Sequence, residues 1–472
     1  MLINSTVNQS VSLESDGGGS KLYVFGITLV ATLGGLLFGY DTAVISGAIG
    51  YLKDYFHLDP AAEGFAAASI LLGCVFGAVL AGKLSSSLGR KKSLLLAAVL
   101  FLIASVGTSL PTEYWQLIVA RLIGGIGVGI ASMISPMYIA EMAPANIRGK
   151  LVSFNQFAIV SGILLSFFVN YMINRPDDPA WCIETGWRIM FLAMAIPSAL
   201  FFVFMLLVPE SPRFLMMKKQ EESAFKVLKK VNGEKNAKII QDSIRDSLEA
   251  ESKDLHGSIF VKGMLLAVVV GCLLSIFQQI TGINTILYYA PEIFKNMGSS
   301  SDSAFLQTVI VGIVNVVFTI VAIVSVDKFG RKPLLIIGSF GMAIGMMSLG
   351  TFAYTQNLGM GALLSIIFYM ASFALSWGPV TWVMISEIFP NSVRSLAMSI
   401  AVAAQWIFNF IVSQTFPMML KDEGLVETFH GGFPFWLYGI MAIISVFVVW
   451  RMVPETKGKS LEDMEHMWLN RK

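Results

Sequence analysis

Long apolar runs follow one another along this chain of 472 residues, separated by short polar segments. A helix that spans a bilayer needs about 20 mostly apolar residues, whereas a membrane β-barrel would show short segments of alternating polarity. The pattern therefore predicts an all-α membrane protein. Twelve spanning helices are expected, at residues 22–49, 65–86, 93–111, 115–142, 150–174, 187–208, 260–290, 304–326, 333–353, 359–386, 395–419 and 433–452.

Composition agrees with this class. Hydrophobic residues make up 55% of the chain and charged residues 14%, and the mean hydropathy is +0.70. A soluble protein of this length needs more polar surface than that. The first 20 residues are polar and rich in glycine and serine, without the basic segment and apolar run of a signal peptide, so we expect a flexible tail.

The loops alternate in charge, which predicts an orientation. Lysine and arginine gather in the segments 85–93, 146–150, 213–253, 327–333, 391–395 and 451–459, and the intervening loops are poor in them. Because basic loops stay on the cytoplasmic side, both termini are expected in the cytoplasm, in a cell membrane that is most simply a bacterial inner membrane.

Three motifs recur in the same order 241 to 246 residues later. Gly89-Arg90-Lys91 returns at 330–332, the segment 141–148 (EMAPANIR) at 387–394 (EIFPNSVR), and Val208-Pro209-Glu210 at 453–455. This repeat predicts two pseudo-symmetric six-helix bundles, an organisation typical of transporters that rock one half against the other. The expected domains are a tail at 1–20, halves at 21–211 and 259–453, a cytoplasmic helical linker at 212–258 and a second tail at 454–472.

Eight motifs in order carry a family resemblance. They are FGYDTAVISG (38–47), RLIGGIGVG (121–129), PMYIAEMAPANIRGK (136–150), PESPRFL (209–215), QQITGIN (278–284), VDKFGRKP (326–333), SWGPVTWVMISEIFP (376–390) and PETKGKS (454–460). Over residues 22–465 the chain resembles the sugar porter family of the major facilitator superfamily, and within it the bacterial proton-coupled xylose and hexose symporters. The resemblance implies the major facilitator fold.

Asp41 and Arg121 are charged residues inside predicted spans. A charge at a helix centre costs about 2.5 to 3.5 kcal/mol on insertion scales, so these residues are expected to pair. Protonation of Asp41 would then release Arg121 and change how the helices pack. The resemblance supports a proton-coupling role, because proton-coupled members carry aspartate at this place in FGYD. The alternative is a permanent salt bridge that fixes helix register.

The stretch from Phe277 to Pro291 interrupts an apolar run with amides, tyrosines and a glycine. On an ideal helix Gln278 and Gln279 do not share a face with Asn284, and Gly282 offers a break that would bring them together. Asn284 and Tyr288, four residues apart, do share a face. Amides both donate and accept hydrogen bonds, as sugar hydroxyls do, so the stretch predicts a site for a neutral hydroxylated substrate.

By resemblance, ten residues match sugar-contacting positions. They are Phe38, Gln156, Gln278, Gln279, Asn284, Tyr288, Asn315, Trp377, Gln405 and Trp406. Ile163, on the helix of Gln156, is expected to trim one side of the pocket. The alternative for each amide is a contact between helices, and for each aromatic ring it is core packing.

The repeated motifs place acids and arginines at the cytoplasmic helix ends. This expected gating network comprises Arg90, Glu141, Arg148, Glu210, Arg331, Glu387, Arg394 and Glu455. Weak pairs of this kind, spanning the two halves, could close in one state and open in the other; the alternative is ordinary solvated loop charge. Ser86 stands where the family often has aspartate, so the first-half set is expected to be weaker than the second, which keeps Asp327.

Other chemistries lack their motifs. The chain has no Walker loop, HExxH, GxSxG or CxxC sequence. Glycines 124, 125, 127 and 129 are expected to allow close helix packing. Cys74, Cys182 and Cys272 are expected to be unpaired, and His57, His256, His430 and His466 are poor metal ligands. We expect no enzyme activity, cofactor, metal or nucleic acid, and a monomer in the lipid bilayer.

The sequence thus predicts a proton-coupled monosaccharide symporter that works by alternating access. Three alternatives remain open at this point. The first is a facilitative sugar uniporter in which Asp41 is structural, the second is a sugar-sensing receptor that does not transport, and the third is an efflux pump for amphipathic drugs.

Overall fold

The computed structural model describes residues 19–253, 262–357, 359–389, 393–458, 464 and 467–468. Over these residues the regular secondary structure is helical throughout. Residues 1–18 of the expected first tail, 254–258 of the expected linker and most of the expected second tail lie outside the described residues, as do His256 and His466.

The first half begins with α1 (Lys21–Ala43), α2 (Ile45–Phe56), α3 (Pro60–Ser87), α4 (Arg90–Ser109), α5 (Tyr114–Met142) and α6 (Arg148–Ile173). It ends with α7 (Pro179–Trp181), a π-helical turn (Cys182–Gly186), α8 (Trp187–Leu192) and α9 (Ala195–Leu207). The helices α10 (Pro212–Met217), α11 (Glu221–Asn232) and α12 (Glu234–Lys253) follow. They are the short amphipathic linker helices that the sequence predicts.

The second half contains α13 (Lys262–Ile280), α14 (Ile283–Asn296), α15 (Ser301–Phe329), α16 (Arg331–Tyr354), α17 (Met360–Leu375), α18 (Trp377–Ile388), α19 (Arg394–Lys421), α20 (Glu423–Phe429) and α21 (Phe433–Met452). Twelve helical segments of the described residues are long and apolar enough to cross a membrane, from Lys21–Phe56 to Phe433–Met452. Their bounds agree with the predicted spans to within a few residues, except that several extend further.

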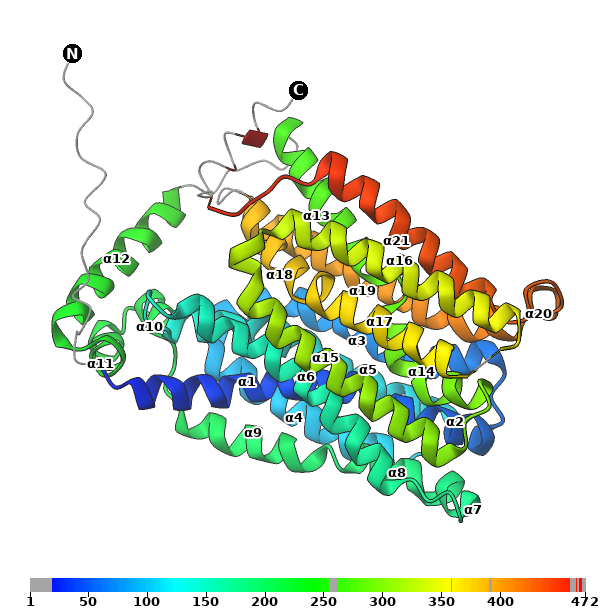
Figure 1. The fold of residues 1–472 in the computed structure, drawn as a ribbon. Coiled ribbons are helices and arrows are strands. Elements are labelled where there is room, and N and C mark those ends of the chain that lie inside the picture. The colour runs from blue at the N-terminus through cyan, green and yellow to red at the C-terminus, as the bar shows by residue number, and fades with distance from the viewer. Residues whose placement is uncertain are drawn as a thin grey trace.

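Figure 1 shows the two halves side by side, with the blue-to-teal helices of the first half below the yellow-green-to-red helices of the second. The helices α10, α11 and α12 lie at one end, which we call the linker side, and α7 and α20 lie at the opposite end, which we call the far side. Between the halves, α3 packs along α19 and α6 along α15.

Glycines allow the closest helix contacts of the first half. A Cβ atom on Gly125 would lie 2.0 Å from the carbonyl oxygen of Ile70, and one on Gly129 would lie 2.4 Å from that of Cys74. Real Cβ contacts are longer, so α3 and α5 approach as they do only because these positions lack side chains. The predicted packing role of this glycine stripe is confirmed, and the three cysteines are unpaired as expected.

Besides the span Pro179–Leu207, which contains α7, α8 and α9, three spans are interrupted. α1 ends and α2 begins around Val44, α13 ends and α14 begins around Gly282, and α17 ends and α18 begins around Ser376. The break at Gly282 was predicted, whereas the other two were not. Gly282 has φ of +90°, and a Cβ atom there would lie 2.5 Å from the Tyr438 ring, so both its backbone and its neighbour require glycine.

Candidate functional site

The break at Gly282 brings three amides into one chain of hydrogen bonds. The Asn284 amide donates to Oε1 of Gln279 at 2.6 Å, and the Gln279 amide donates to Oε1 of Gln278 at 3.2 Å. The Gln278 amide then donates to the carbonyl oxygens of Trp377 and Gly378 at 2.8 and 3.2 Å. The predicted meeting of Asn284 with the two glutamines is therefore confirmed, and it ties α14 and α13 to the first turn of α18.

The amides of this chain are buried or half-buried, but they retain donors and acceptors that form no hydrogen bond within the chain. Gln278 and Gln279 are 3% and 5% exposed, and Asn284 is half-buried. An amide offers two donors and two acceptor lone pairs, and the hydrogen bonds within the chain use one acceptor on each glutamine and none on Asn284. Asn284 thus presents an acceptor at the end of a chain that its neighbours hold in place.

Trp377 lies differently from the other predicted substrate residues. Its side chain is fully buried, and its indole N–H donates to Ser339 Oγ at 2.8 Å and to the Leu335 carbonyl at 3.1 Å. Its contribution to the amide chain is its backbone oxygen. Trp382, five residues along the same helix, is the half-buried tryptophan here, and sequence inspection did not single it out.

Gln405 and Trp406 add unsatisfied polar atoms on α19. Both residues are buried, at 4% and 2% exposed, yet Gln405 Oε1 and Trp406 Nε1 have no hydrogen-bond partner among the described residues. The Trp406 ring lies 5.6 Å from the ring of Phe38, which comes from the other half. An unpaired buried donor or acceptor costs roughly 1 to 3 kcal/mol, so these atoms favour a hydroxylated ligand that would satisfy them.

For the remaining predicted substrate residues, the structure gives the exposure of each side chain and the helix on which it lies. Asn315 on α15 is 4% exposed, and Gln156 on α6 is half-buried. These two helices pack together across the two halves. Ile163 is buried on α6 as well. The roles of these residues in binding stay predictions.

Asp41 and Arg121 meet inside the first half, as expected. Asp41 Oδ1 lies 3.9 Å from Arg121 Nη1, and the two residues are 3% and 1% exposed. The guanidinium also donates to the backbone oxygen of Asp41 at 3.3 Å and to that of Ala67 at 3.1 Å. Asp41 Oδ2 has no partner among the described residues, and Gly124 leaves the space beside it.

This geometry suits a carboxyl that gains and loses a proton. An ionised oxygen that is buried without a donor is unfavourable, and protonation turns that oxygen into a hydroxyl group. The two carbonyls that hold Arg121 remain available in either protonation state. The expected release of the arginine on protonation is therefore opposed by these two anchors.

Tyr288, on the same helix as Asn284, interacts electrostatically with the charge pair. Tyr288 is 2% exposed and lies one helical turn after Asn284 on α14. It interacts electrostatically with Arg121 and Asp41, and its side chain is hydrogen-bonded to Asn409. A residue of the second half therefore lies against the charge pair of the first.

On the linker side, the first-half motifs form a clasp, which we define as Arg90, Lys91, Glu141 and Glu210. Arg90 Nη2 donates to Glu141 Oε1 at 2.7 Å, and the Glu210 carboxylate accepts from the backbone N–H of Arg90 at 3.0 Å and of Lys91 at 3.1 Å. Lys91 Nζ donates to the Leu206 carbonyl at 2.8 Å. The acid thus caps the start of α4 and the lysine the end of α9, which suits both helix dipoles.

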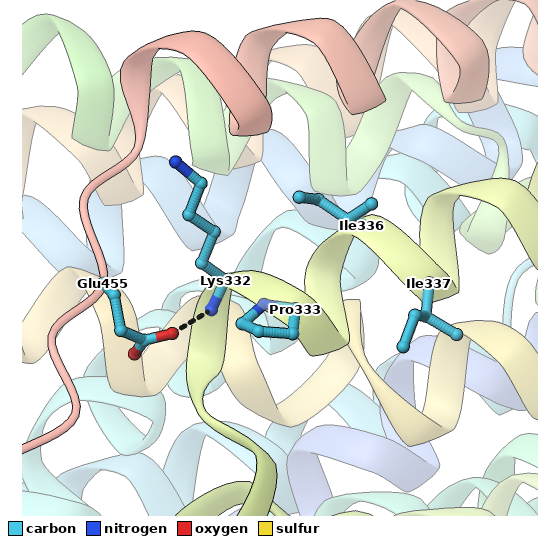
Figure 2. A pocket seen from close by; sticks show the side chains of 5 residues that line it. All are labelled: Lys332, Pro333, Ile336, Ile337 and Glu455. Atoms are coloured by element: carbon cyan, nitrogen blue, oxygen red, sulfur yellow. Dashed lines mark hydrogen bonds between the residues drawn. The ribbon is translucent and has the colours of Figure 1, made fainter.

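The second-half clasp, Arg331, Lys332, Glu387 and Glu455, repeats this arrangement with more bonds. Arg331 donates to both oxygens of Glu387, at 2.9 and 3.2 Å, and the Thr456 hydroxyl donates to Glu387 at 2.5 Å. Figure 2 shows the Lys332 backbone N–H donating to Glu455 at 3.0 Å. The groove drawn there has a volume of about 420 Å³. Its lining residues are Lys332, Pro333, Ile336, Ile337 and Glu455, and none of them is a predicted substrate residue.

The arginine and its acid share fewer hydrogen bonds in the first-half clasp than in the second, and the expectation of a weaker first-half set, which rests on Ser86 and Asp327, stays a prediction. Arg90 makes one bond to Glu141, and Arg90 Nε and Glu141 Oε2 have no partner among the described residues. The residue that corresponds to Thr456 is Ser211, 245 residues earlier, and its hydroxyl caps α10 by accepting from Phe214 N at 3.2 Å. This serine-for-threonine difference was visible in the repeat, but we had not connected it with the clasp.

The capping glutamates have pKa values shifted in opposite directions. Burial raises the pKa of Glu210 above its ordinary value, although backbone N–H groups of Ser211, Lys91 and Arg90 oppose the shift. Burial acts on Glu455 too, but four backbone N–H groups outweigh it and hold its pKa below the ordinary value. The second-half clasp therefore favours its ionised carboxylate more strongly.

Two predicted network members lie outside these clasps. Arg394 donates to the Ser386 carbonyl at 2.6 Å, and Arg148 is exposed and forms no ion pair with a described residue. The ion pairs between described members of the network, Arg90 with Glu141 and Arg331 with Glu387, each lie within one half. That the network closes across the halves in another state stays a prediction.

The two halves meet on the far side instead. Lys421 on α19 donates to the Glu63 carboxylate on α3, and Gln414 donates to the Ala61 carbonyl at 2.8 Å. Among the ion pairs of the described residues, Lys421 with Glu63 is the one that joins the halves. In the sequence Glu63 looked like a loop charge, so this contact was missed.

Comparisons with known proteins agree with this architecture. The chain is 52% identical over 472 residues to the D-xylose-proton symporter of Escherichia coli, covering 94% of this chain and 96% of that protein. It is 43% identical to the arabinose-proton symporter of Bacillus subtilis, covering 95% of each. The solved inward-open conformation of the xylose transporter XylE from E. coli matches with a TM-score of 0.83 and 49% identity, covering 94% of this chain and all of that one.

A family model described as "Sugar (and other) transporter" matches residues 27–468. Because the match takes in both halves and the linker between them, the chain belongs to this family of sugar transporters.

Proposed function

We propose that this protein is a proton-coupled monosaccharide symporter that works by alternating access, with a pentose or hexose such as xylose or glucose as its substrate. The observation that carries the proposal is the buried Asp41 carboxyl, which has one unpartnered oxygen beside a carbonyl-anchored Arg121. The relatives named for sugar and proton symport support it.

The sugar is proposed to bind at the amide chain and at the unpaired atoms of Gln405 and Trp406. Amide groups match hydroxyls in having both donors and acceptors. Phe38 and Trp406 supply apolar ring surface for the C–H groups of the sugar. No enzyme activity is proposed, since these groups bind and orient a ligand without a paired acid and base around it.

Proton and sugar binding are proposed to favour one another through Tyr288. By linkage, each then raises the affinity of the other by the same factor. The halves at 21–211 and 259–453 would rock about the site, with the linker side in the cytoplasm and the protein a monomer in the bilayer. In that orientation the far-side contacts correspond to closure towards the outside.

Uptake of labelled D-xylose and D-glucose into energised vesicles, with and without a protonophore, tests the proposal. We expect accumulation above equilibrium that the protonophore abolishes. A facilitative uniporter, the second candidate, would equilibrate either sugar and ignore the protonophore. Binding without any uptake would favour a sugar sensor.

A further inference from the structure

The far-side contact between the halves is built around one ion pair. Glu63 lies in the first turn of α3, and Lys421 is the last residue of α19. Lys421 Nζ donates to Glu63 Oε2, and the two side chains are 32% and 5% exposed. A carboxylate that is buried so far needs its partner, because burial without one is unfavourable.

Neighbouring contacts between α3 and α19 close the interface between the halves around this ion pair. A Cβ atom on Gly64 would lie 2.2 Å from the Gln414 carbonyl oxygen, so α3 and α19 touch through their backbones. The rings of Phe65 and Phe410 lie 6.2 Å apart, one helical turn further in from Gln414. A cavity of about 40 Å³ lies beside the pair, with room for roughly one water molecule.

A second contact places two charged residues of the second half against α2 of the first half. Glu292 and Lys295 on α14 form an ion pair at 3.0 Å, and the position of a Cβ atom on Gly50 of α2 would be 2.4 Å from Glu292. Lys295 Nζ lies 5.3 Å from the centre of the Tyr51 ring on α2. Figure 1 shows α2 and α14 next to each other at the far side.

The charges of Glu63 and Lys421 are also each suited to the helix end at which they lie. An acid in a first turn and a base in a last turn interact favourably with the helix dipole. Glu63 and Lys421 can therefore remain charged and hydrated when the halves separate. Their attraction adds to stability only when the far side is closed, unlike the linker-side clasps, which stay within one half.

We propose that Glu63 and Lys421 form a lock between the halves that stabilises the conformation closed on the far side and thereby sets the balance between the two access states. The proposal rests on the alternating access proposed above. Its test needs no transported sugar, so the lock and the proposed substrate fail separately.

The test measures distances between spin labels at Leu110 and Met360, which are exposed far-side positions of the first and second halves. Both are changed to cysteine in the full-length protein in lipid nanodiscs. The chain without these two substitutions is labelled in the same way to measure the background signal from its own cysteines. We expect Glu63→Gln and Lys421→Gln each to raise the ratio of long to short distances about tenfold, which corresponds to ~1.4 kcal/mol. The double variant should go no further than either single variant, because both remove the same pair.

Glu427→Gln is the matched control, since Glu427 is an exposed far-side acid on α20. It should leave the distances unchanged. Single variants with wild-type distances would overturn the lock, as would a double variant whose effect is the product of the two single effects. If Glu63→Gln does not fold, Lys421→Gln carries the test, because its side chain is the more exposed of the two.

Discussion

The two halves share a repeat but differ at the centre of the molecule. The segments that lie 241 to 246 residues after Asp41 and Arg121, at 282–287 and 362–367, contain no charged residue. Conversely, the first-half segment that corresponds to Asn284, residues 38–43, contains no amide. Each half has therefore kept a polar centre of a different kind.

This difference separates two tasks. The first half holds the group proposed to carry the proton, and the second holds the hydrogen-bonded amides proposed to bind the sugar. Coupling between proton and sugar must then cross from one half to the other. Tyr288 and Tyr289, on the same helix as Asn284, both interact electrostatically with Arg121, and Tyr288 also does so with Asp41.

The largest effect is expected from Asp41→Asn, which removes the ionisable group of the first half. Asparagine keeps the shape but cannot exchange a proton, so accumulation should fall to equilibrium. At 100 mV a coupled charge is worth about 2.3 kcal/mol, so roughly fiftyfold accumulation is lost. Vesicle uptake measures this, and sugar counterflow should persist.

Asp177→Asn is the matched control for that change, because Asp177 is an exposed far-side acid. It should accumulate sugar like the wild type. Continued accumulation by Asp41→Asn would leave Asp41 as half of a structural pair and break the division between the halves.

Asn284→Ala should weaken sugar binding about tenfold to hundredfold. The change removes a proposed ligand group and also leaves Gln279 Oε1 without its donor, and such losses cost roughly 1 to 3 kcal/mol. Sugar titration in detergent measures the affinity. Gln307→Ala, which alters an amide that bonds Ser299 and Ser303 on the same half, should leave the affinity alone; equal losses in both variants would mean a general effect on folding.

Gly282→Ala tests how the second half builds its site. Both Gly282 and Gly298 have φ near +90°, but a Cβ atom on Gly298 would meet nothing within 4 Å. Alanine should cost about 1 kcal/mol at either position for the backbone, and more at Gly282, where it strikes the Tyr438 ring. Thermal unfolding of the two variants measures the difference. Equal destabilisation would show that Tyr438 moves aside freely.

Local features of this chain could be predicted from the sequence. The apolar runs predicted the twelve spans, and Gly282 between amides predicted the break in the seventh span. Both depend on residues close together in the chain. The break at Ser376 was missed, because Trp377 and Gly378 continue an apolar run and Pro379 is tolerated in the first turn of a new helix.

Contacts between distant segments were harder to predict. Trp377 was chosen by residue type, but its indole is bonded to Ser339 on another helix, 38 residues earlier. Glu63 and Lys421 come together across 358 residues, and neither lies in a repeated motif. A pattern along one sequence carries no information on which loops of the two halves meet, so such pairs become visible only in the fold.

The smallest effect concerns the clasps, where the halves are most alike. The pKa of Glu455 lies below its ordinary value of 4.5, so its ionised form contributes stability that is present above that value and is lost as the pH falls through the native pKa. The pKa of Glu210 is raised, so its contribution has the opposite sign, being full below 4.5 and lost as the pH rises through the native value. Glu455→Gln should therefore lower the unfolding temperature at pH 7 by more than it does near pH 4, and Glu210→Gln should show the reverse trend. Thermal unfolding in detergent across this pH range measures both, and parallel curves for the two variants would show that the clasps respond to acid alike.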